Sequence, residues 1–301
     1  AQVQEAAEMT PEERLREEAW EREQAAKRAP TPTAKAGIGG TPGAAVYSTR
    51  ILKATALLGD TRILLEHWDA SVPIKENLER FQSENIFGKA SRSRVQDILK
   101  IFRQRYLTDP QVAIALSVLA KGRLAGASLD RILYYHSALC DHLIYDVVAG
   151  VLLPQRNSGI MEVSLPRIQQ KLRDWIADGR TASAWSDCTI ERVTQNLVAT
   201  LRDFGVLEGA VNKRIAAAYL PIEAFAYICF YIKQNQPSGK ELIRHPDWQL
   251  FFMQPEGVER SLAEAHQRHL LEWHAAGSVT RLTFPAANLE EYARVLVERA
   301  Y

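Results

Sequence analysis

The fold is decided by the stretch Trp185-Ser-Asp-Cys-Thr-Ile-Glu-Arg-Val-Thr-Gln-Asn-Leu-Val-Ala-Thr-Leu-Arg-Asp-Phe-Gly205. Its apolar residues recur at helical spacing, and these are Ile190, Val193, Leu197, Leu201 and Phe204. Ser186 or Thr189 suits the N-terminal cap of a helix, and Gly205 suits the left-handed residue that ends one. The stretch therefore predicts an amphipathic helix.

The segments on either side of this helix extend the pattern. Val206-Leu207 predicts a short strand, 208–214 a polar turn, and Ile215 to Leu220 a second strand before Pro221. Upstream, Ser164 to Trp175 predicts another capped helix, which closes at Gly179. Helix, turn, helix and hairpin in this order are typical of a winged helix-turn-helix, whose second helix commonly enters the DNA major groove.

The face opposite the apolar stripe is polar, with small Ala199 leaving room for close approach; its other members are Arg192, Gln195, Asn196 and Arg202. Arginine can pair with guanine, while glutamine and asparagine can pair with adenine. Lys213 and Arg214 at the tip of the predicted wing suit phosphate contacts. A polar face used for packing or protein contact fits equally, because residues 162–215 hold eight basic and seven acidic side chains.

A second helix-turn-helix pattern lies nearer the N-terminus. Pro73 to Phe81 predicts a short amphipathic helix, Ser83 to Gly88 a turn, and Ser93 to Tyr106 a longer helix. The predicted buried stripe of the longer helix consists of Val95, Ile98, Leu99, Phe102 and Tyr106. Facing away from this stripe are Gln96, Lys100, Arg103 and Gln104.

This second pattern is strongly basic. Between Asn85 and Leu107, one acid, Asp97, stands against six basic residues, which are Lys89, Arg92, Arg94, Lys100, Arg103 and Arg105. Such a local excess in a chain of net charge +1 predicts a surface that attracts phosphates. Ser91 and Ser93 add neutral donors at the start of the helix. A solvated basic face, or an acidic protein partner, is the alternative.

Bulk properties indicate an ordinary globular protein. The 301 residues are 47% hydrophobic and 24% charged, which is enough chain for two cores. The three cysteines, Cys140, Cys188 and Cys229, lack metal-type spacing, so reduced thiols in a cytoplasmic protein are expected. Ile215 to Ile232 approaches the length of a membrane span, but Pro221 and Glu223 suit a helix start. We therefore expect a strand and a core helix, and no membrane partner.

We predict a mainly α, multi-helical globular fold with two helix-turn-helix units, the second followed by a β-hairpin. The predicted regions are a flexible N-terminal extension (1–45), a helical domain with the first unit (46–155), a domain with the second (156–235) and a C-terminal helical segment packing on it (236–301). Within them we expect long helices at Ser128–Ala149 and Gly257–Ala276, a strand at Val279–Phe284 and a last helix at Asn288–Arg299.

Catalytic and metal-binding patterns are weak. His136 and Cys140 are four residues apart, as two metal ligands on a helix would be. Both lie on the apolar stripe of their helix, which favours a core histidine and a buried thiol. The sequence has no phosphate loop, dinucleotide glycine fingerprint, nucleophile elbow or metalloprotease helix. We expect no catalytic residue, metal or cofactor, and hence a protein that is not an enzyme.

From Tyr47 onward the chain resembles the BrxA family of bacteriophage exclusion (BREX) defence systems, also catalogued as a putative inner-membrane family of unknown function. The resemblance covers about 255 residues. It rests on Tyr47-Ser-Thr-Arg50 with Leu64-Leu65, Ser91-Arg-Ser-Arg94 leading to Arg103-Gln-Arg-Tyr-Leu107, Tyr134-Tyr-His136 to Asp146, and Trp185 through Gly205.

The resemblance implies a monomeric, mostly helical protein that binds double-stranded DNA through two helix-turn-helix units. It also implies that the protein acts with a methyltransferase and ATPases of the defence system. The rival expectation is a scaffold whose winged helix holds a partner protein without touching DNA.

Overall fold

Helices make up most of the chain in the computed structural model, which describes residues 47–53, 55–235, 238–276 and 279–300. Within these residues the only sheets are two antiparallel pairs of strands. The predicted mainly α fold is therefore confirmed. The extension predicted at 1–45 lies outside the described residues.

In the described part of the chain, nine helical elements come before residue 158, and two of them, α3 and α4, form the N-terminal helix-turn-helix pattern. In chain order they are η1 (Thr49–Leu52), α2 (Leu58–Glu66), α3 (Ile74–Glu84), α4 (Arg92–Tyr106), α5 (Pro110–Lys121), α6 (Gly126–Cys140), α7 (His142–Val147), η2 (Val148–Leu152) and α8 (Leu153–Asn157). The elements that follow are α9 (Leu165–Ala177), α10 (Asp187–Asp203), β1 (Leu207–Glu208), β2 (Arg214–Ile215), α11 (Ile222–Asn235), α12 (Gly239–Ile243), η3 (Pro246–Phe251), α13 (Pro255–Gln267), β3 (Glu272–Ala276), β4 (Val279–Thr283) and α14 (Leu289–Arg299).

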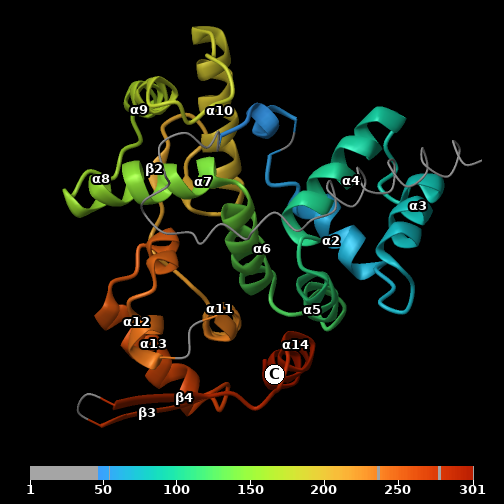
Figure 1. Ribbon diagram of the computed structural model, residues 1–301, viewed down its shortest axis with the longest axis vertical. Helices are drawn as coiled ribbons and strands as arrows, with labels where there is room; N and C mark the ends of the chain where they lie inside the picture. Colours follow the sequence, from blue (N-terminus) through green and yellow to red (C-terminus); the bar gives the residue numbers. More distant parts are fainter. Residues whose placement is uncertain (1–46, 54, 236–237, 277–278, 301) are drawn as a thin grey trace, which may run out of the picture. The chain divides into compact units, whose positions relative to one another are not determined.

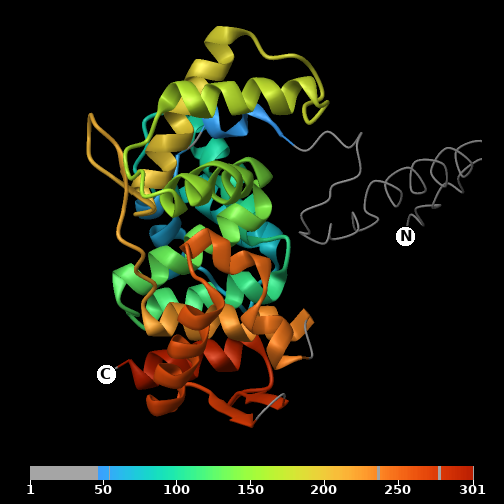
Figure 2. The same ribbon diagram turned by 90° about the vertical axis from the view of Figure 1, so that its left-hand side faces the viewer.

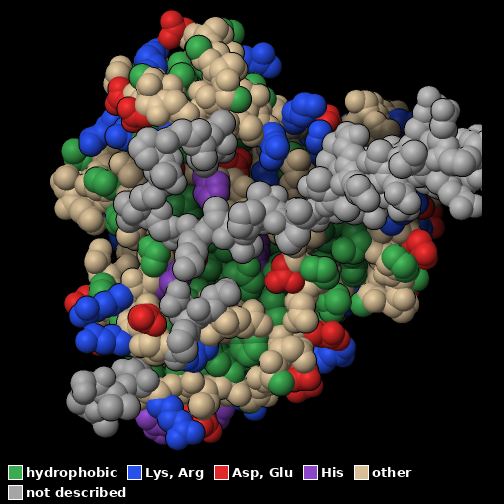
Figure 3. All heavy atoms as spheres, in the orientation of Figure 1, with side chains coloured by type: hydrophobic (Ala, Val, Ile, Leu, Met, Phe, Trp, Pro, Cys, Tyr) green, Lys and Arg blue, Asp and Glu red, His purple; other side chains and the backbone are tan. Residues whose placement is uncertain are grey.

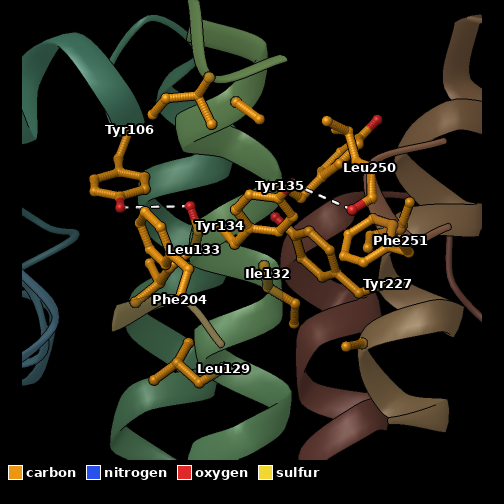
Figure 4. Packing of buried hydrophobic residues seen from close by; sticks show 14 of the residues in the cluster. Tyr106, Leu129, Ile132, Leu133, Tyr134, Tyr135, Phe204, Tyr227, Leu250 and Phe251 are labelled. Atoms are coloured by element: carbon orange, nitrogen blue, oxygen red, sulfur yellow. Dashed lines mark hydrogen bonds between the residues drawn. The ribbon is translucent and has the colours of Figure 1, made fainter. Parts of the chain in front are cut away.

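Helix α6 is the central core element. Its residues Ile132, Leu133 and Tyr134 are fully buried. Figure 4 shows them between side chains of α4, α10, α11 and η3. The phenol of Tyr134 donates to the carbonyl of Leu250 (3.2 Å), and the phenol of Tyr106 hydrogen-bonds to Ser137 (2.9 Å). Burial of these aromatic side chains, with their hydroxyl groups satisfied, stabilises the packing of α4 and η3 on α6.

The two predicted helix-turn-helix units, α3 with α4 and α9 with α10, lie at different places around α6. Figures 1 and 2 show α9 and α10 at one end and β3, β4 and α14 at the other, with α3 and α4 to the side of α6 in Figure 1. Helix α14 packs along α5, and α11 contacts α12, α13 and α14. All described residues belong to one compact unit. The division at residues 155 and 235 stays a prediction.

The long helix expected at Ser128–Ala149 is interrupted, so that prediction was wrong. Asp141 adopts an extended conformation, with φ −114° and ψ 92°, and its carboxylate accepts a hydrogen bond from the backbone N–H of Leu143 (3.2 Å). It therefore ends α6 and caps α7. Cys140 beside it is exposed, whereas His136 is buried. The expectation that both side chains are buried holds for His136 alone.

The helix expected at Gly257–Ala276 is also shorter than predicted. Helix α13 ends at Gln267, and His269 takes a left-handed conformation with φ 58°. Leu270 and Leu271 are then buried, and β3 begins at Glu272. A non-glycine residue in the left-handed region ends this helix, so the sequence carried no ordinary stop signal. The strand and last helix predicted after it are present as β4 and α14.

The apolar run 215–232 is divided and its helix is present as predicted, since α11 begins at Ile222, but β2 already ends at Ile215. The carboxylate of Glu223, in the first turn of α11, accepts a hydrogen bond from Ser128 (3.0 Å) and pairs with Arg268 (3.4 Å). No single helix in the described ranges is long and apolar enough to cross a membrane. The helices at 126–140 and 142–157 meet that criterion only when joined, and they are bent by 103°.

Candidate nucleic-acid interface

Helices α3 and α4 form the first predicted pair, and a short polar turn joins them. Asn85 ends α3 in the left-handed region (φ 47°). Its side chain accepts from the N–H of Lys89 (3.1 Å) and donates to the carbonyl of the same residue (2.8 Å). Ser91 then caps α4 by accepting from the N–H of Arg94 (3.4 Å). These local bonds fix where α4 begins.

One face of α4 is exposed and basic. Arg92, Ser93, Gln96, Lys100 and Arg103 are exposed. No hydrogen bond or ion pair joins the guanidinium or ammonium groups of Arg92, Lys100 and Arg103 to another described residue. We call these three residues the basic stripe. Their spacing of i, i+8 and i+11 places them along one side of the helix over about 16 Å.

The other three basic residues of the predicted patch are engaged elsewhere. Lys89 pairs with Asp60 of α2 (3.0 Å), and Arg94 donates to the carbonyl of Lys53 (2.8 Å). Arg105 is only 7% exposed and donates to the carbonyls of Thr55 and Ala56. The patch available to a ligand is therefore smaller than the charge count predicted.

Helices α9 and α10 form the second pair. Ser164 caps α9 and Ser186 caps α10, each by accepting a backbone N–H bond from the third residue after it. The predicted stripe of α10 is buried at all five positions. Gly179 (φ 77°) and Gly205 (φ 74°) end the two helices in the left-handed region, as predicted.

The outward face of α10 is only partly free. Gln195 donates to Glu191 (3.3 Å), and Arg202 donates to Asp203 (2.8 Å). Half-buried Asn196 donates to the carbonyl of Arg192 (2.9 Å). Among the polar residues predicted on this face, only the exposed side chain of Arg192 makes no bond to another described side chain or carbonyl.

The hairpin after α10 consists of β1 and β2, and a third segment, around Glu162, lies along β2. Leu207 pairs with Ile215 and Glu208 with Arg214, and a bridge joins Glu162 to Arg214 on the other side. Gly209 (φ 91°) makes the turn, because a Cβ there would lie 2.2 Å from the carbonyl oxygen of Asn212. The sequence pattern did not predict the segment around Glu162, which is too short to show alternation.

The predicted second strand was too long, since it spans 214–215 rather than 215–220. The N–H of Ala216 still donates to the carbonyl of Val206 (3.0 Å), but the antiparallel pairing does not continue beyond this bond. At the tip, Lys213 donates to the carbonyl of Ala210 (3.1 Å), and Arg214 is exposed. Val211 is 89% exposed at the apex.

Polar contacts of two half-buried residues position α10 and α2 against α6. Arg131 of α6 donates to the carbonyls of Phe204 (3.0 Å) and Gly205 (2.9 Å) at the end of α10. Its neighbour Asp130 pairs with Arg62 of α2 (2.5 Å). Burial raises the pKa of the Asp130 carboxyl, and burial lowers the pKa of Arg131. Both groups are thus partly desolvated, and their contacts hold the helices together.

The segment η1 lies between the two helix pairs. Figure 1 shows it between α10 and α4, and Figure 3 shows Lys and Arg side chains gathered near it. Tyr47, just before η1, donates to Asp146, and Arg180 donates to both Tyr47 (2.9 Å) and Asp146 (3.1 Å). Burial and the Asp146 carboxylate raise the pKa of the Tyr47 phenol. The protonated phenol thus anchors the start of η1 to α7 and to the segment that follows α9.

Groups suited to metal or proton chemistry are few. No group of three or more His, Cys, Asp or Glu side chains that could hold a metal ion occurs within the described ranges. His136 lies 3.0 Å from the phenol of Tyr227, and burial lowers its pKa to about 3. A neutral, hydrogen-bonded histidine of this kind is a core residue.

Comparison with known proteins yields one finding. The model of the BrxA family matches residues 45–230, which include both helix pairs and the hairpin. No curated protein matches the chain.

Proposed function

The chain belongs to the BrxA family, and from this premise we propose that it binds double-stranded DNA as an accessory protein of a bacteriophage exclusion complex. Family membership implies association with other components of a BREX system. The proposal adds the nature of the ligand and the surface that contacts it.

The observation that carries the proposal is the basic stripe on α4. Three cations point into solvent from the second helix of a helix-turn-helix pair without an acidic partner among the described residues. The carboxylate of Asp97, the acid of this helix, lies 3.6 Å from the ammonium of Lys53, which offsets its negative charge. The stripe is about 16 Å long, and the major groove is about 12 Å wide. Arg92 and Arg103 can therefore reach phosphates on opposite sides of one groove.

The second pair, with its hairpin, has the element order of a winged helix. We propose that it supplies a weaker DNA contact through Arg192 of α10 and Arg214 of the hairpin. A protein contact by this unit is a second candidate. It is favoured by the internal pairs Gln195–Glu191 and Arg202–Asp203 and by the exposed apolar tip at Val211.

We further propose that the protein is cytoplasmic, monomeric alone and without catalytic activity of its own. In this proposal the methyltransferase and ATPase components supply the chemistry. The DNA-binding protein would position them on the duplex.

The test compares two triple variants of equal net charge. Arg92→Gln, Lys100→Gln and Arg103→Gln remove the basic stripe, whereas the control variant changes Arg244, Arg260 and Arg281 to Gln. These control residues are exposed and lie on other elements. Fluorescence anisotropy with a labelled duplex, over a series of salt concentrations, measures affinity and its salt slope.

We expect the stripe variant to lose about a hundredfold or more in affinity at low salt. Its slope of log K against log salt should become shallower by about 2 to 3, since each phosphate contact contributes about 0.9. The control should bind as the unchanged protein does. Failure of the unchanged protein to bind any duplex at low salt would refute the proposed function.

A further inference from the structure

A small polar cavity lies where η1, α4 and the α6–α7 junction meet. Its volume is about 50 Å³, and its polar lining comes from Ser48, Arg50, Gln104, Arg105, Asp141 and His142. One water molecule needs roughly 15 Å³ of such space. The cavity therefore has room for the oxygens of a small anionic group.

Four of these side chains are available to a ligand. Those of Ser48, Arg50, Gln104 and His142 make no hydrogen bond to another described residue. Together they offer a guanidinium, an amide, a hydroxyl and an imidazole, all of which can donate to an oxyanion. The site is thus a set of donors from three elements rather than one charged side chain.

The remaining two charged groups are already engaged. Arg105 donates to the carbonyls of Thr55 and Ala56, which leaves its positive charge in place. Asp141 accepts the N–H of Leu143 and is near both Arg50 and Arg105. Two guanidinium groups against one carboxylate leave the cavity with a net positive charge, so it favours an anion over a cation.

The position of the cavity links it to both helix pairs. Gln104 directly follows Arg103 of the basic stripe, while η1, which carries Arg50, packs on α10. Figure 1 shows η1 in this intermediate place. A ligand in the cavity would contact the surface between the two helix pairs.

We propose that this cavity binds a phosphate group, and that its source is the DNA backbone as it passes between the two helix pairs. The proposal rests on the DNA-binding function proposed above. Arg50 supplies the paired donors, and Gln104, Ser48 and His142 complete the oxygen contacts. This assigns a phosphate-binding role to Arg50, which belongs to neither helix pair.

Two single variants of the full-length chain test the proposal. Arg50→Gln removes the free guanidinium, and Gln104→Glu adds a carboxylate of the same shape. The matched controls are Arg260→Gln and Gln267→Glu, both at exposed positions on α13. Duplex affinity is measured over a salt series, and thermal stability is measured with and without inorganic phosphate, with chloride at equal ionic strength as the reference.

We expect Arg50→Gln and Gln104→Glu each to weaken duplex binding about tenfold. The salt slope should become shallower by about 0.9. The two controls should leave both quantities unchanged. Equal melting temperatures of the variants and the unchanged protein show that the loss is not caused by unfolding.

Other outcomes separate the two proposals. If both cavity variants bind duplex normally while the stripe variant does not, the DNA function stands and the cavity proposal is overturned. If the unchanged protein binds no duplex but inorganic phosphate raises its melting temperature, and Arg50→Gln abolishes this rise, the cavity binds phosphate from a free ligand and the backbone source is wrong. If neither DNA nor phosphate has an effect, both proposals fail.

Discussion

Asp60 of α2 lies 3.0 Å from the ammonium of Lys89, in the turn that leads into α4. The carboxylate is well shielded, and the lysine side chain is 36% exposed. A cation held in this way is less available to phosphate than the three residues of the basic stripe. The contact explains why the number of basic residues in the sequence overstates the charge that a ligand meets.

Removing Asp60 should therefore strengthen DNA binding. Asp60→Asn frees Lys89 beside the start of α4, and we expect a two- to threefold gain in duplex affinity at low salt, about 0.5 kcal/mol. Lys89→Gln should change the affinity less than Arg92→Gln does. Anisotropy measurements on the three variants check both statements. A loss of affinity in Asp60→Asn without a loss of stability would contradict the expectation.

Arg131 should be important for the stability of the second helix pair. Arg131→Met keeps the length of the side chain but removes both bonds to the carbonyls of Phe204 and Gly205. We expect a loss of about 1 to 3 kcal/mol in the free energy of unfolding, because hydrogen bonds to a charged donor are lost in a largely buried place. Urea unfolding of this variant and of Arg260→Met, an exposed control, measures the effect. Equal stability of the two variants would show that the capping of α10 by Arg131 is unimportant.

The sequence predicted helices best where the apolar period is long. All five stripe positions of α10 are buried, and the buried stripe of α4 was also predicted correctly. The breaks at Asp141 and His269 were missed. Asp141 ends a helix by capping the next one, and His269 turns the chain in the left-handed region, where residues other than glycine are uncommon.

The sequence predicted where the basic face of α4 lies, but not how many of its positive charges are free of other contacts. Periodicity placed Lys100 and Arg103 on the outward face of α4, whereas Arg92 was predicted only as part of the basic segment before the helix. The partners of Lys89 and Arg105 come from 58–66 and 55–56, and the sequence gives no periodic signal that joins these segments to α4. From the sequence, Arg50 stood out only as part of the segment Tyr47-Ser-Thr-Arg50, which resembles the family pattern. Its cavity forms by tertiary packing of three elements, which no local pattern encodes.

The contact between Gly122 and Val297 should limit substitution where α5 meets α14. A Cβ at Gly122 would lie 2.5 Å from both γ-carbons of Val297. We expect Gly122→Ala to lower the free energy of unfolding by about 1 to 3 kcal/mol through overpacking. In a Val297→Ala background the same change should cost less, because the opposing γ-carbons are absent and only the contact with the Val118 carbonyl oxygen (3.0 Å) remains. A double-mutant cycle by chemical unfolding measures this coupling, and additive effects would contradict it.

His136 should make stability depend on pH in mildly acid solution. Burial lowers its pKa in the folded protein to about 3 from an ordinary value of 6.5. Between these values the unfolded chain binds a proton that the folded protein excludes, so the free energy of unfolding rises with pH across that window. As pH falls from about 6 to about 4, this residue should lower stability by up to about 1.4 kcal/mol per pH unit.

Replacing both members of the hydrogen-bonded pair, as His136→Leu with Tyr227→Phe, removes the titrating group without leaving the phenol unpaired. Urea unfolding at pH 7, 6, 5 and 4 should give a shallower loss for the double variant than for the unchanged protein. Parallel losses would show that other groups cause the acid sensitivity.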